Sequence, residues 1–258
     1  MSRKYETGAN GFIGKNLLAK LKGVTTIPHD QILKTELKTF SYFYFLSTYG
    51  NMATHTDDKK IIQANVIDLA HIVNQLVGMD IKSFVFMSSS SVKLPRQTMY
   101  SRTKKAAEEI LLAHIEKHNL PICIVRPFSV TGVGEQAGHL IPTLIRSCLD
   151  QEHMSFVPNP SHDFIDVDDV TNGLINLATN GARGIYELGW GQKHSNDDVR
   201  KIVEDVTGKK ANYTEVPHLR DYDTKHWVST NFRSRHFGWK PEKTLRESIE
   251  EMVEAYAK

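Results

Sequence analysis

A tyrosine and a lysine four residues apart, Tyr100 and Lys104, are the side chains that point most directly to chemistry. On a helix they project from one face, so the ammonium group of Lys104 can lie beside the phenol of Tyr100 and favour its ionised form. A free tyrosine has a pKa of about 10 and is a poor base at neutral pH without such a neighbour. The pair predicts proton exchange with a hydroxyl or carbonyl group. An ordinary solvated pair on a helix is the alternative.

A second group of residues has the spacing of a phosphate-binding loop. Gly8, Gly11 and Gly14 precede a helical run from Lys15 to Leu21. Gly8 would allow a tight turn, Gly11 would let a pyrophosphate approach the backbone, and Gly14 would let the helix pack closely on a sheet. Free amides at the start of the helix would face the phosphates. The spacing favours a dinucleotide cofactor, with a glycine triplet in an ordinary loop as the alternative.

Composition bounds the class of protein. The chain has 258 residues, 40% hydrophobic and 24% charged, which is enough to bury a substantial core. A formal net charge of +2 provides no basic field for nucleic acid. No apolar run approaches the roughly 18 residues that span a bilayer, and the start MSRKYE does not resemble a signal peptide. Cys123 and Cys148 fall in a predicted buried strand and helix, which suits a reducing compartment. We therefore expect a cytoplasmic protein with no membrane segment and no nucleic-acid partner.

Other polar groupings predict no metal site. His114 and His118 are four apart but lack the His-Glu-x-x-His pattern of a zinc site. The aspartates between 163 and 169 lack the glycine-containing loop of about twelve residues that binds calcium. Asp168 is instead predicted to cap the helix that follows it.

Strands that alternate with amphipathic helices must position these residues. Short apolar runs predict strands at Val24–Ile27, Tyr42–Leu46, Phe84–Met87 and Ile122–Val125. Helical periodicity predicts helices over 14–22, 57–78, 100–118, 139–150, 168–179, 195–207 and 243–256. The pattern is that of an α/β fold with a doubly wound parallel sheet.

Two segments depart from that pattern. Residues 2–6 are far more polar than a strand buried on both faces should be, so we expect this first strand to be weakly formed. The segment from Val24 to Tyr42 is too short for the usual strand and crossover. It predicts that one peripheral strand of the sheet is missing or moved.

Several ordered motifs together make the chain resemble the extended short-chain dehydrogenase/reductase family, in particular its nucleotide-sugar epimerase/dehydratase branch. They are TGANGFIG, FLSTYGN, FVFMSSSSV, YSRTK, IVRPFSVTG, HDFIDVDDV, GIYELGWG and FGWKP, and they span nearly the whole sequence. The resemblance implies a Rossmann-type sheet with a small C-terminal α/β substrate lobe. It places an NAD(P)-binding lobe at 1–134 and 164–189 and a substrate-binding lobe at 135–163 and 190–258.

The resemblance also implies a catalytic triad of Ser89, Tyr100 and Lys104. Tyr100 would exchange a proton with the substrate while a nicotinamide carries hydride, Ser89 would bond the same oxygen, and Lys104 would hold the nicotinamide ribose. Besides the three glycines, the residues expected to contact the cofactor are Asn10, Phe12, Ile13, Asp30, Leu46, Ser47, Thr48, Asn65, Tyr100, Lys104, Pro127 and Phe128.

The end of the second strand normally selects the cofactor, because a carboxylate there bonds the adenosine ribose of NAD and repels the extra phosphate of NADP. Pro28 stands at the expected position, Asp30 follows, and no arginine comes after it. Asp30 either reaches the ribose after a small shift or is a loop or cap residue. We expect NAD and leave NADP open.

The residues after Ser89 narrow the reaction. Relatives that dehydrate sugars carry an Asp-Glu pair there, whereas this chain has Ser90 and Ser91. With no extra acid or base, the resemblance implies 4-epimerisation of a nucleotide sugar through a transient ketone, or reduction of a keto-sugar. Ser90, Ser129, His162 and Arg233 are the candidate substrate contacts, and Arg146 or Arg220 could replace Arg233 at the diphosphate.

Alternatives remain at the substrate side. His162 stands where relatives often carry an arginine, and the stretch from Ser89 to Tyr100 is short. One alternative is an NAD(P)H-dependent reductase of a small non-nucleotide carbonyl compound, and another is a non-catalytic cofactor-sensing protein. Relatives often pair through helices equivalent to 57–78 and 100–118. We therefore expect a homodimer with Ile110, Leu111 and His114 on or near its interface.

Overall fold

The computed structural model describes residues 3–52, 54–217 and 227–257. The chain forms two compact units that interleave along the sequence. Unit 1 comprises residues 1–127, 171–187 and 232–239, and unit 2 comprises residues 128–170, 188–231 and 240–258. This division assigns no function, so the cofactor and substrate lobes expected from the sequence stay a prediction.

Unit 1 is built on a six-stranded sheet in the order β10-β5-β4-β3-β1-β2. Its strands are β1 (Lys4–Thr7), β2 (Val24–Ile27), β3 (Tyr42–Phe45), β4 (Ser83–Met87), β5 (Ile122–Pro127) and β10 (Gly184–Leu188). Strands β1 to β5 pair in parallel, so the segments that follow their carboxyl ends gather at one edge of the sheet. The predicted parallel sheet is confirmed.

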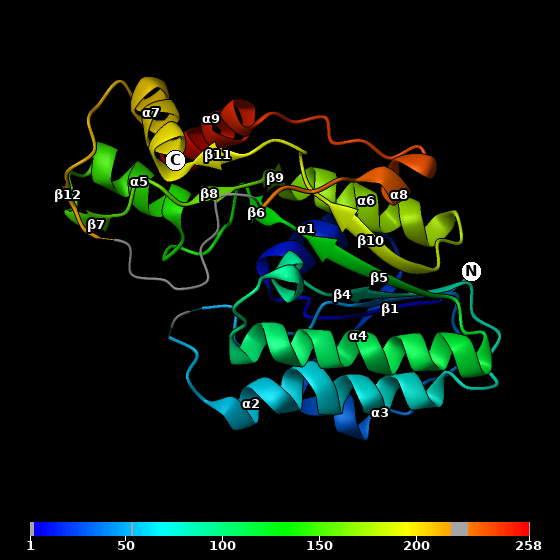
Figure 1. Cartoon of the computed structure of the whole chain (residues 1–258). Helices are drawn as coiled ribbons and strands as arrows, with labels where there is room; N and C mark the ends of the chain where they lie inside the picture. The colour runs from blue at the N-terminus through cyan, green and yellow to red at the C-terminus, as the bar shows by residue number, and fades with distance from the viewer. Residues whose placement is uncertain (1–2, 53, 218–226, 258) are drawn as a thin grey trace. The chain divides into compact units, whose positions relative to one another are not determined.

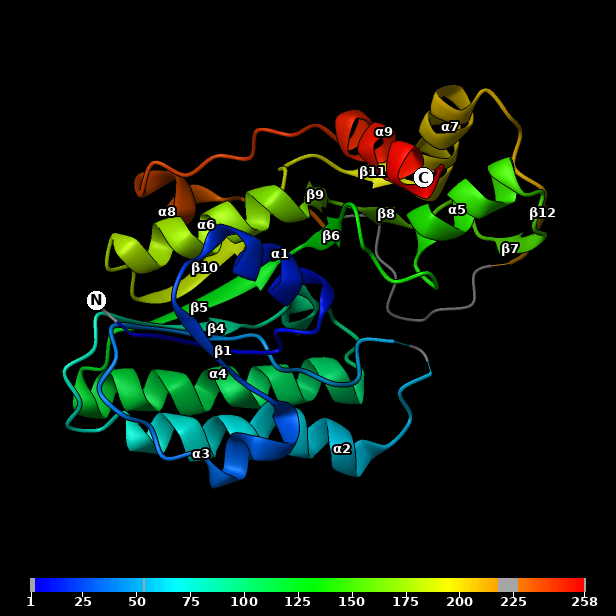
Figure 2. The same cartoon turned by 180° about the vertical axis from the view of Figure 1, so that it is seen from behind.

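Helices cover both faces of this sheet. They are α1 (Phe12–Lys20), α2 (Asp58–Ile62), the π-helical turn η2 (Gln63–Ile67), α3 (Asp68–Gln75), α4 (Met99–His118), α6 (Val167–Thr179) and α8 (Phe232–His236). The continuous helix from α2 to α3 lies beside α4 on one face, and α1 with residues 171–179 of α6 lies on the other (Figures 1 and 2). An apolar core rich in phenylalanine fills the space between the sheet and the α3–α4 layer.

The expectation that the first strand is weakly formed, which rested on its polarity, is wrong. β1 is not weakly formed, because it lies inside the sheet and pairs with β2 on one side and β3 on the other. Tyr5 joins the aromatic core, and the Thr7 hydroxyl accepts a hydrogen bond from the Ser47 amide at 3.1 Å. Glu6 is fully buried, and neither of its carboxyl oxygens has a hydrogen-bond partner among the described residues. Burial raises the pKa of Glu6 to about 8, so the strand holds a largely neutral carboxylic acid at pH 7.

The short connection between β2 and β3 leaves the described sheet without one peripheral strand, as expected. Within the described residues the chain forms only a 3-10 helix there, η1 (His29–Lys34), and β2 is the last strand on its side of the sheet. The predicted absence of a peripheral strand is thereby confirmed for the part of the chain that the structure describes.

The predicted helices lie where expected, with ends displaced by at most three residues. The sequence patterns did not predict α8, which is a single short turn of helix. Across the described ranges, no helix is both long and apolar enough to cross a bilayer.

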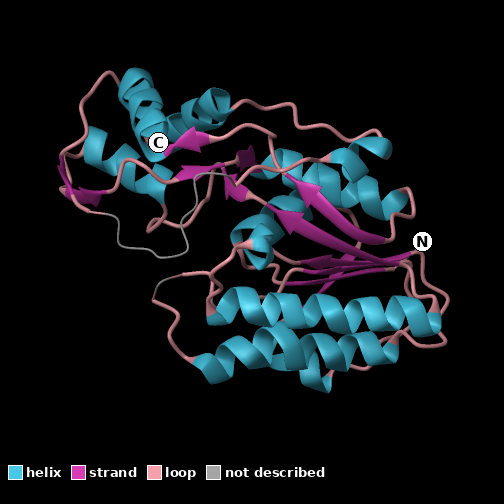
Figure 3. Cartoon of the chain, viewed as in Figure 1, coloured by secondary structure: helices cyan, strands magenta, loops and turns pink. Residues whose placement is uncertain are grey.

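Unit 2 is a small α/β unit. Its helices are α5 (Leu140–Leu149), α7 (Asn196–Thr207) and α9 (Leu245–Tyr256), which pack around one apolar core. Its short strands pair as β6 (Ser129–Thr131) with β9 (Phe164–Asp166), β7 (Met154–Phe156) with β12 (Tyr213–Glu215), and β8 (Ser161–His162) with β11 (His194–Ser195) (Figure 3). Capping boxes at Ser195 and Thr244 begin α7 and α9.

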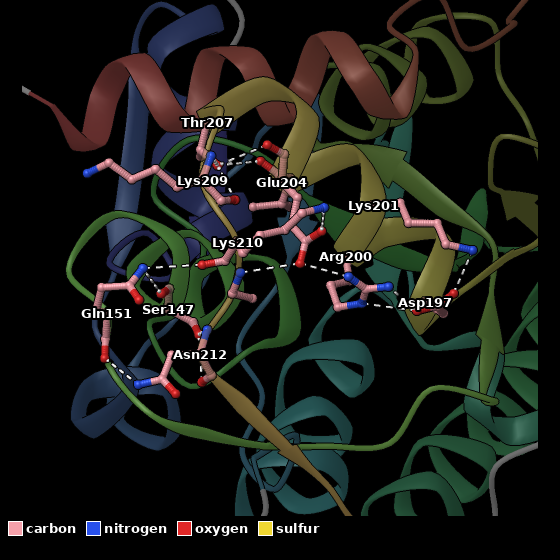
Figure 4. A network of polar contacts seen from close by, with 12 residues as sticks. Ser147, Gln151, Asp197, Arg200, Lys201, Glu204, Thr207, Lys209, Lys210 and Asn212 are labelled. Carbon is pink, nitrogen blue, oxygen red and sulfur yellow. Dashed lines mark hydrogen bonds and ion pairs between the residues drawn. The ribbon is translucent and has the colours of Figure 1, made fainter.

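A polar network fastens α7 to the segment that leads into β12 (Figure 4). The nearly buried carboxylate of Glu204 accepts hydrogen bonds from Arg200 and Lys210 at 2.7 Å each, and from the Ala211 amide at 3.3 Å. Burial alone would raise the pKa of Glu204, but the bonds from Lys210 and Arg200 bring it below its ordinary value. In unit 2, therefore, a buried carboxylate is fully paired, in contrast to Glu6 in unit 1.

Replacing Glu6 by methionine is expected to stabilise the protein. Methionine has a similar volume and leaves no unpartnered polar atom, so the free energy of unfolding should rise by about 1–3 kcal/mol near pH 8. The folded-state pKa of Glu6 lies above its ordinary value of 4.5, so the stability that depends on its proton is fully present below pH 4.5. It is lost as the pH rises through about 8. Urea unfolding of Glu6→Met and the wild type from pH 5 to 9 should show a gap that widens with pH.

The exposed Glu36 provides the matched control, since Glu36→Met makes the same substitution on the surface of unit 1. It should leave the free energy of unfolding almost unchanged. A lower stability of Glu6→Met than of the wild type would show that the Glu6 carboxyl group has a favourable partner.

Candidate active site

The glycine turn follows β1 directly. Gly8 has a φ of +82°, and a Cβ atom there would lie 2.7 Å from the carbonyl carbon of Leu46. The Gly11 amide donates to the Gly8 carbonyl at 2.9 Å. A Cβ atom on Gly14 would lie only 2.2 Å from the same carbonyl oxygen. The tight turn at Gly8 and the close helix packing at Gly14 are therefore as predicted, since no other residue fits either position without a shift.

Helix α1 begins immediately after this turn. Gly11 is its N-cap and provides no side-chain hydrogen bond to the first turn. Phe12 and Ile13 form that first turn and are only partly buried, and Asn10 is exposed. Uncapped amides at the start of a helix, beside a turn without side chains, fit a pyrophosphate group.

The segment after β3 lies against the glycine turn. The Leu46 amide donates to the Thr7 carbonyl at 3.1 Å, and Ser47 is held by the Thr7 hydroxyl. The Thr48 hydroxyl donates to the side-chain oxygen of Asn65 at 2.9 Å. The structure thus brings together residues 46–48 and the glycine loop, which the sequence placed near one cofactor.

Asn65 lies in the π-helical turn η2 and is fully buried. Its oxygen accepts from Thr48 and from the Tyr49 amide, and its nitrogen donates to the Tyr49 carbonyl and to the Thr103 hydroxyl at 2.9–3.0 Å. These bonds use all the hydrogen-bonding capacity of the amide. We therefore expect Asn65 to act on a cofactor by fixing the 48–49 segment to α4, and not through direct contact.

Tyr100 stands in the first turn of α4, which Thr98 caps by accepting a hydrogen bond from the Ser101 amide at 3.3 Å. Burial raises the pKa of the Tyr100 phenol, whereas hydrogen bonds with Thr48 and Ser89 lower it. The structure thus joins Tyr100 to Ser89, as the resemblance implied.

Ser91 is a residue that the sequence analysis missed. Its hydroxyl lies 2.8 Å from the Ser89 hydroxyl, and its amide donates to the Ser89 oxygen at 3.1 Å. Ser89 caps the 3-10 helix η3 (Ser90–Lys93), which explains the contact, because a serine at an N-cap bonds the backbone two residues on. The signal available in the sequence was a pair of serines two residues apart, directly after a predicted strand.

Lys104 is almost completely buried one turn beyond Tyr100. Its ammonium group donates to the Met87 carbonyl at 2.8 Å and lies 6.0 Å from the centre of the Tyr100 ring. Burial lowers the pKa of Lys104 to about 7, and the neighbouring Glu108 acts in the opposite direction. Met87 is the one hydrogen-bond partner that the described residues give this group, so donors remain for ribose hydroxyl groups.

Glu108 and Arg126 are further residues that sequence reasoning missed. Glu108 is buried on α4 and accepts a hydrogen bond from Ser88 at 2.5 Å. Arg126, on β5, binds both carboxylate oxygens of Glu108 at 2.8 and 2.5 Å. The available signal was the four-residue spacing of Tyr100, Lys104 and Glu108, which places all three on one helix face.

The remaining predicted cofactor contacts are dispersed. Asp30 is exposed in η1, where its carboxylate accepts a bond from the Gln31 amide group at 3.0 Å. Pro127 ends β5, at the same edge of the sheet as the glycine turn. Phe128 belongs to unit 2, where its amide donates to the Leu188 carbonyl at 2.9 Å. These three assignments stay predictions.

The predicted substrate contacts are divided between the two units. Ser90 is buried in η3 of unit 1. In unit 2, the Ser129 amide donates to the Asp163 carbonyl at 2.9 Å, and the ring of His162 lies 5.5 Å from that of Trp227. A substrate role for Ser90, Ser129 and His162 stays a prediction.

The candidate diphosphate arginines have other contacts in the structure. Arg233 donates to the Ile185 and Arg183 carbonyls at 2.8 and 3.1 Å, and its guanidinium group lies 4.6 Å from the Tyr186 ring. Its expected contact with a diphosphate stays a prediction. Arg146 pairs with Glu152 at 2.9 Å, and Arg220 lies outside the described residues.

No group of three or more histidine, cysteine, aspartate or glutamate residues is arranged to hold a metal ion in the described part of the chain.

Comparison with known proteins identifies relatives of one kind. A model of the "NAD dependent epimerase/dehydratase family" matches residues 36–189. GDP-6-deoxy-D-mannose reductase of Pseudomonas aeruginosa is 24% identical over 96% of this chain and 94% of its own length. UDP-glucuronate 4-epimerase of Thermodesulfobacterium geofontis is 23% identical over 88% of this chain and 76% of its own. The structure of MoeE5 in complex with UDP-glucose and NAD superposes with a TM-score of 0.89, at 24% identity and 99% coverage of both chains.

Alanine at Gly14 is expected to destabilise the chain, because its Cβ atom would overlap the Gly8 carbonyl and α1 would have to move away from the turn. Overpacking of this kind costs about 1–3 kcal/mol. Gly11→Ala is the control, since its Cβ would lie 3.2 Å from the same oxygen at an ordinary φ of −77°. Thermal unfolding should rank Gly14→Ala well below Gly11→Ala, and equal melting temperatures would contradict the close packing.

Proposed function

The chain belongs to the NAD dependent epimerase/dehydratase family and is thus an enzyme of the extended short-chain dehydrogenase/reductase type, and from that premise we propose its substrate and chemistry. We propose that it uses NAD(P) to epimerise a nucleotide sugar at one carbon, in the manner of a 4-epimerase, or to reduce a keto-sugar. The observation that carries this proposal is the Tyr100 hydroxyl, which bonds Ser89 and Thr48 one helical turn from the buried ammonium group of Lys104.

The residues of the glycine turn and of the Lys104 pocket would hold the cofactor. The turn at Gly8 and the start of α1 would receive the pyrophosphate, and Lys104 would bond the nicotinamide ribose. When bound, the nicotinamide ring supplies the site that gains and returns hydride. Asp30 follows β2 and, with no arginine after it, favours NAD over NADP.

Tyr100 would move the proton. In the oxidising direction it would take a proton from a substrate hydroxyl, and in the reducing direction it would give one to the carbonyl oxygen. Ser89 would donate a hydrogen bond to the same oxygen. Burial raises the pKa of Tyr100, so its ionised form needs a nearby positive charge, which Lys104 provides when protonated.

The substrate class rests on the relatives and on the residues after Ser89. One relative is named as a reductase of a GDP-sugar and another as a 4-epimerase of a UDP-sugar. Ser90 is buried and Ser91 bonds Ser89, so the triad has no carboxylate beside it in η3 to remove water from a sugar. This favours oxidation and reduction at one carbon over dehydration. Ser90, Ser129 and His162 are the proposed substrate contacts.

The competing function is reduction of a small carbonyl compound that carries no nucleotide. The departure of His162 from the expected arginine and the bonds of Arg233 to two backbone carbonyls favour it. A cofactor sensor without catalysis is a third reading, and the assembled triad argues against it because a sensor needs no proton relay.

We further propose a homodimer in a reducing cytoplasm. Both cysteines, Cys123 and Cys148, are free and buried. Ile62 and Ile67 are 41% and 44% exposed on the continuous helix beside α4, which provides apolar surface for a partner copy. Leu111 is fully buried in the core of a single chain, which removes it from the expected interface.

Turnover and binding measured together test the proposed function. UDP-, GDP-, CDP- and dTDP-sugars with NAD or NADP should reveal a substrate, and the matching nucleotide should raise the melting temperature beyond the effect of saturating cofactor. Tyr100→Phe should lose about 10²–10⁴-fold in turnover, because only the proton-transfer oxygen is removed. It should keep both melting-temperature increases.

Tyr42→Phe is the control, since it deletes a phenolic oxygen at the opposite end of β3 from the site. Substantial turnover by Tyr100→Phe would sink the mechanism. If no nucleotide at millimolar concentration stabilises the cofactor-loaded protein, the small-carbonyl reductase replaces the nucleotide-sugar enzyme.

Sedimentation at micromolar concentration tests the homodimer. The wild type should sediment as a dimer, and Ile67→Lys should weaken association because it places a charge on the proposed interface. Val133→Lys replaces an equally exposed apolar residue of unit 2 and should have no effect. A monomeric wild type would refute the proposal.

A further inference from the structure

Three side chains of α4 engage three consecutive residues at the end of β4. Tyr100 bonds the Ser89 hydroxyl, Lys104 bonds the Met87 carbonyl, and Glu108 accepts from the Ser88 hydroxyl. Because 100, 104 and 108 are spaced by one helical turn, the contacts form one continuous row. Glu108 therefore extends the row that contains the proposed catalytic residues.

Glu108 is too deeply buried to be an ordinary surface charge. Its side chain is 2% exposed, and that of Arg126 is 19% exposed. Arg126 binds both carboxylate oxygens, and Ser88 provides a third bond. Three donors thus hold the buried carboxylate one helical turn from Lys104.

The surroundings of Lys104 make the charge of Glu108 important. Burial lowers the pKa of Lys104 and so acts against a charged ammonium group, whereas the face of the Phe86 ring, 4.7 Å from the Lys104 nitrogen, favours the charge. The titratable groups about it are Tyr100 and Glu108 from α4, with Arg126 from β5 behind Glu108. Glu187 from β10 and Glu109 influence Arg126 from farther away. Among these titratable groups, Glu108 is the one whose charge favours the charged form of Lys104.

We infer that Glu108 is a positioning residue of the active site: held by Ser88 and Arg126, its carboxylate keeps Lys104 charged and fixes α4 in register with the end of β4. Arg126 orients the carboxylate, and Ser88 couples it to the residue that precedes Ser89. The inference rests on the proposed role of Lys104 in the reaction. The charge state of Lys104 can nevertheless be measured without any turnover.

The test is a titration of Lys104 in the cofactor-free full-length chain labelled with ¹³Cε-lysine. The Lys104 resonance is the one that disappears in Lys104→Arg. Glu108→Gln keeps the size and most hydrogen bonds of the side chain but removes its charge, so the Lys104 midpoint should fall by on the order of one pH unit. Glu108→Asp keeps the charge and should stay closer to the wild type than Glu108→Gln does.

Glu109→Gln is the matched control. It removes the same charge from the adjacent, exposed position of α4 and should leave the Lys104 midpoint unchanged. If Glu108→Gln does not fold, the double variant Glu108→Gln/Arg126→Gln leaves no buried unpaired charge and should show a smaller fall in the midpoint, because it also removes the positive charge of Arg126, which opposes a charged Lys104.

An unchanged Lys104 midpoint in folded Glu108→Gln overturns the inference, even if the melting temperature falls, because a purely structural carboxylate would affect stability alone. Equal shifts in Glu108→Gln and Glu109→Gln overturn it too, since they would reflect net charge. If the midpoint falls as expected while no nucleotide sugar is converted, the inference about Glu108 stands and the proposed function fails.

Discussion

The arrangement of the site depends on how α4 docks against the carboxyl end of β4. The helix presents Tyr100, Lys104 and Glu108 on one face, and each engages one of three consecutive residues of the strand end. The contacts do not follow the same order along the two elements, because residues 100, 104 and 108 engage residues 89, 87 and 88 in turn. The long lysine reaches a backbone carbonyl, whereas the phenol and the carboxylate reach serine hydroxyls.

This docking places polar and charged groups in an interior that is otherwise apolar, and their removal from water costs free energy. Burial lowers the pKa of Lys104 to about 7 and raises that of Tyr100. Ion pairing with Arg126 offsets the cost of burying the Glu108 carboxylate, and Glu108 in turn favours a charged Lys104. Glu6 shows the opposite case, a buried carboxyl group without a partner among the described residues, which gives up its charge instead.

Parallel strands explain why the candidate site gathers residues from distant parts of the chain. The glycine turn follows β1, residues 46–48 follow β3, and Ser89 follows β4, so all reach the same edge of the sheet. The saturated side chain of Asn65 then ties the segment after β3 to α4 through Tyr49 and Thr103. The proposed cofactor contacts therefore belong to unit 1, with the exception of Phe128. Phe128 and the proposed substrate contacts Ser129 and His162 belong to unit 2.

The sequence by itself determined the parallel α/β architecture, because period and spacing are local properties. The triad of Ser89, Tyr100 and Lys104 came from the resemblance to a family, and its catalytic role stays a proposal. From the short segment between Val24 and Tyr42 the sequence also predicted that one peripheral strand is missing or moved. The prediction that β1 is weakly formed was wrong. Its polarity argues against a buried strand, but pairing with β2 and β3 on its two sides buries it. Only the tertiary structure revealed Ser91 beside Ser89, the use of Arg233 by β10, and the Glu108–Arg126 pair. Those contacts join residues that are distant in sequence, or they depend on the direction of a side chain. Burial, which changes the pKa of each charged group, exists only after the chain has folded.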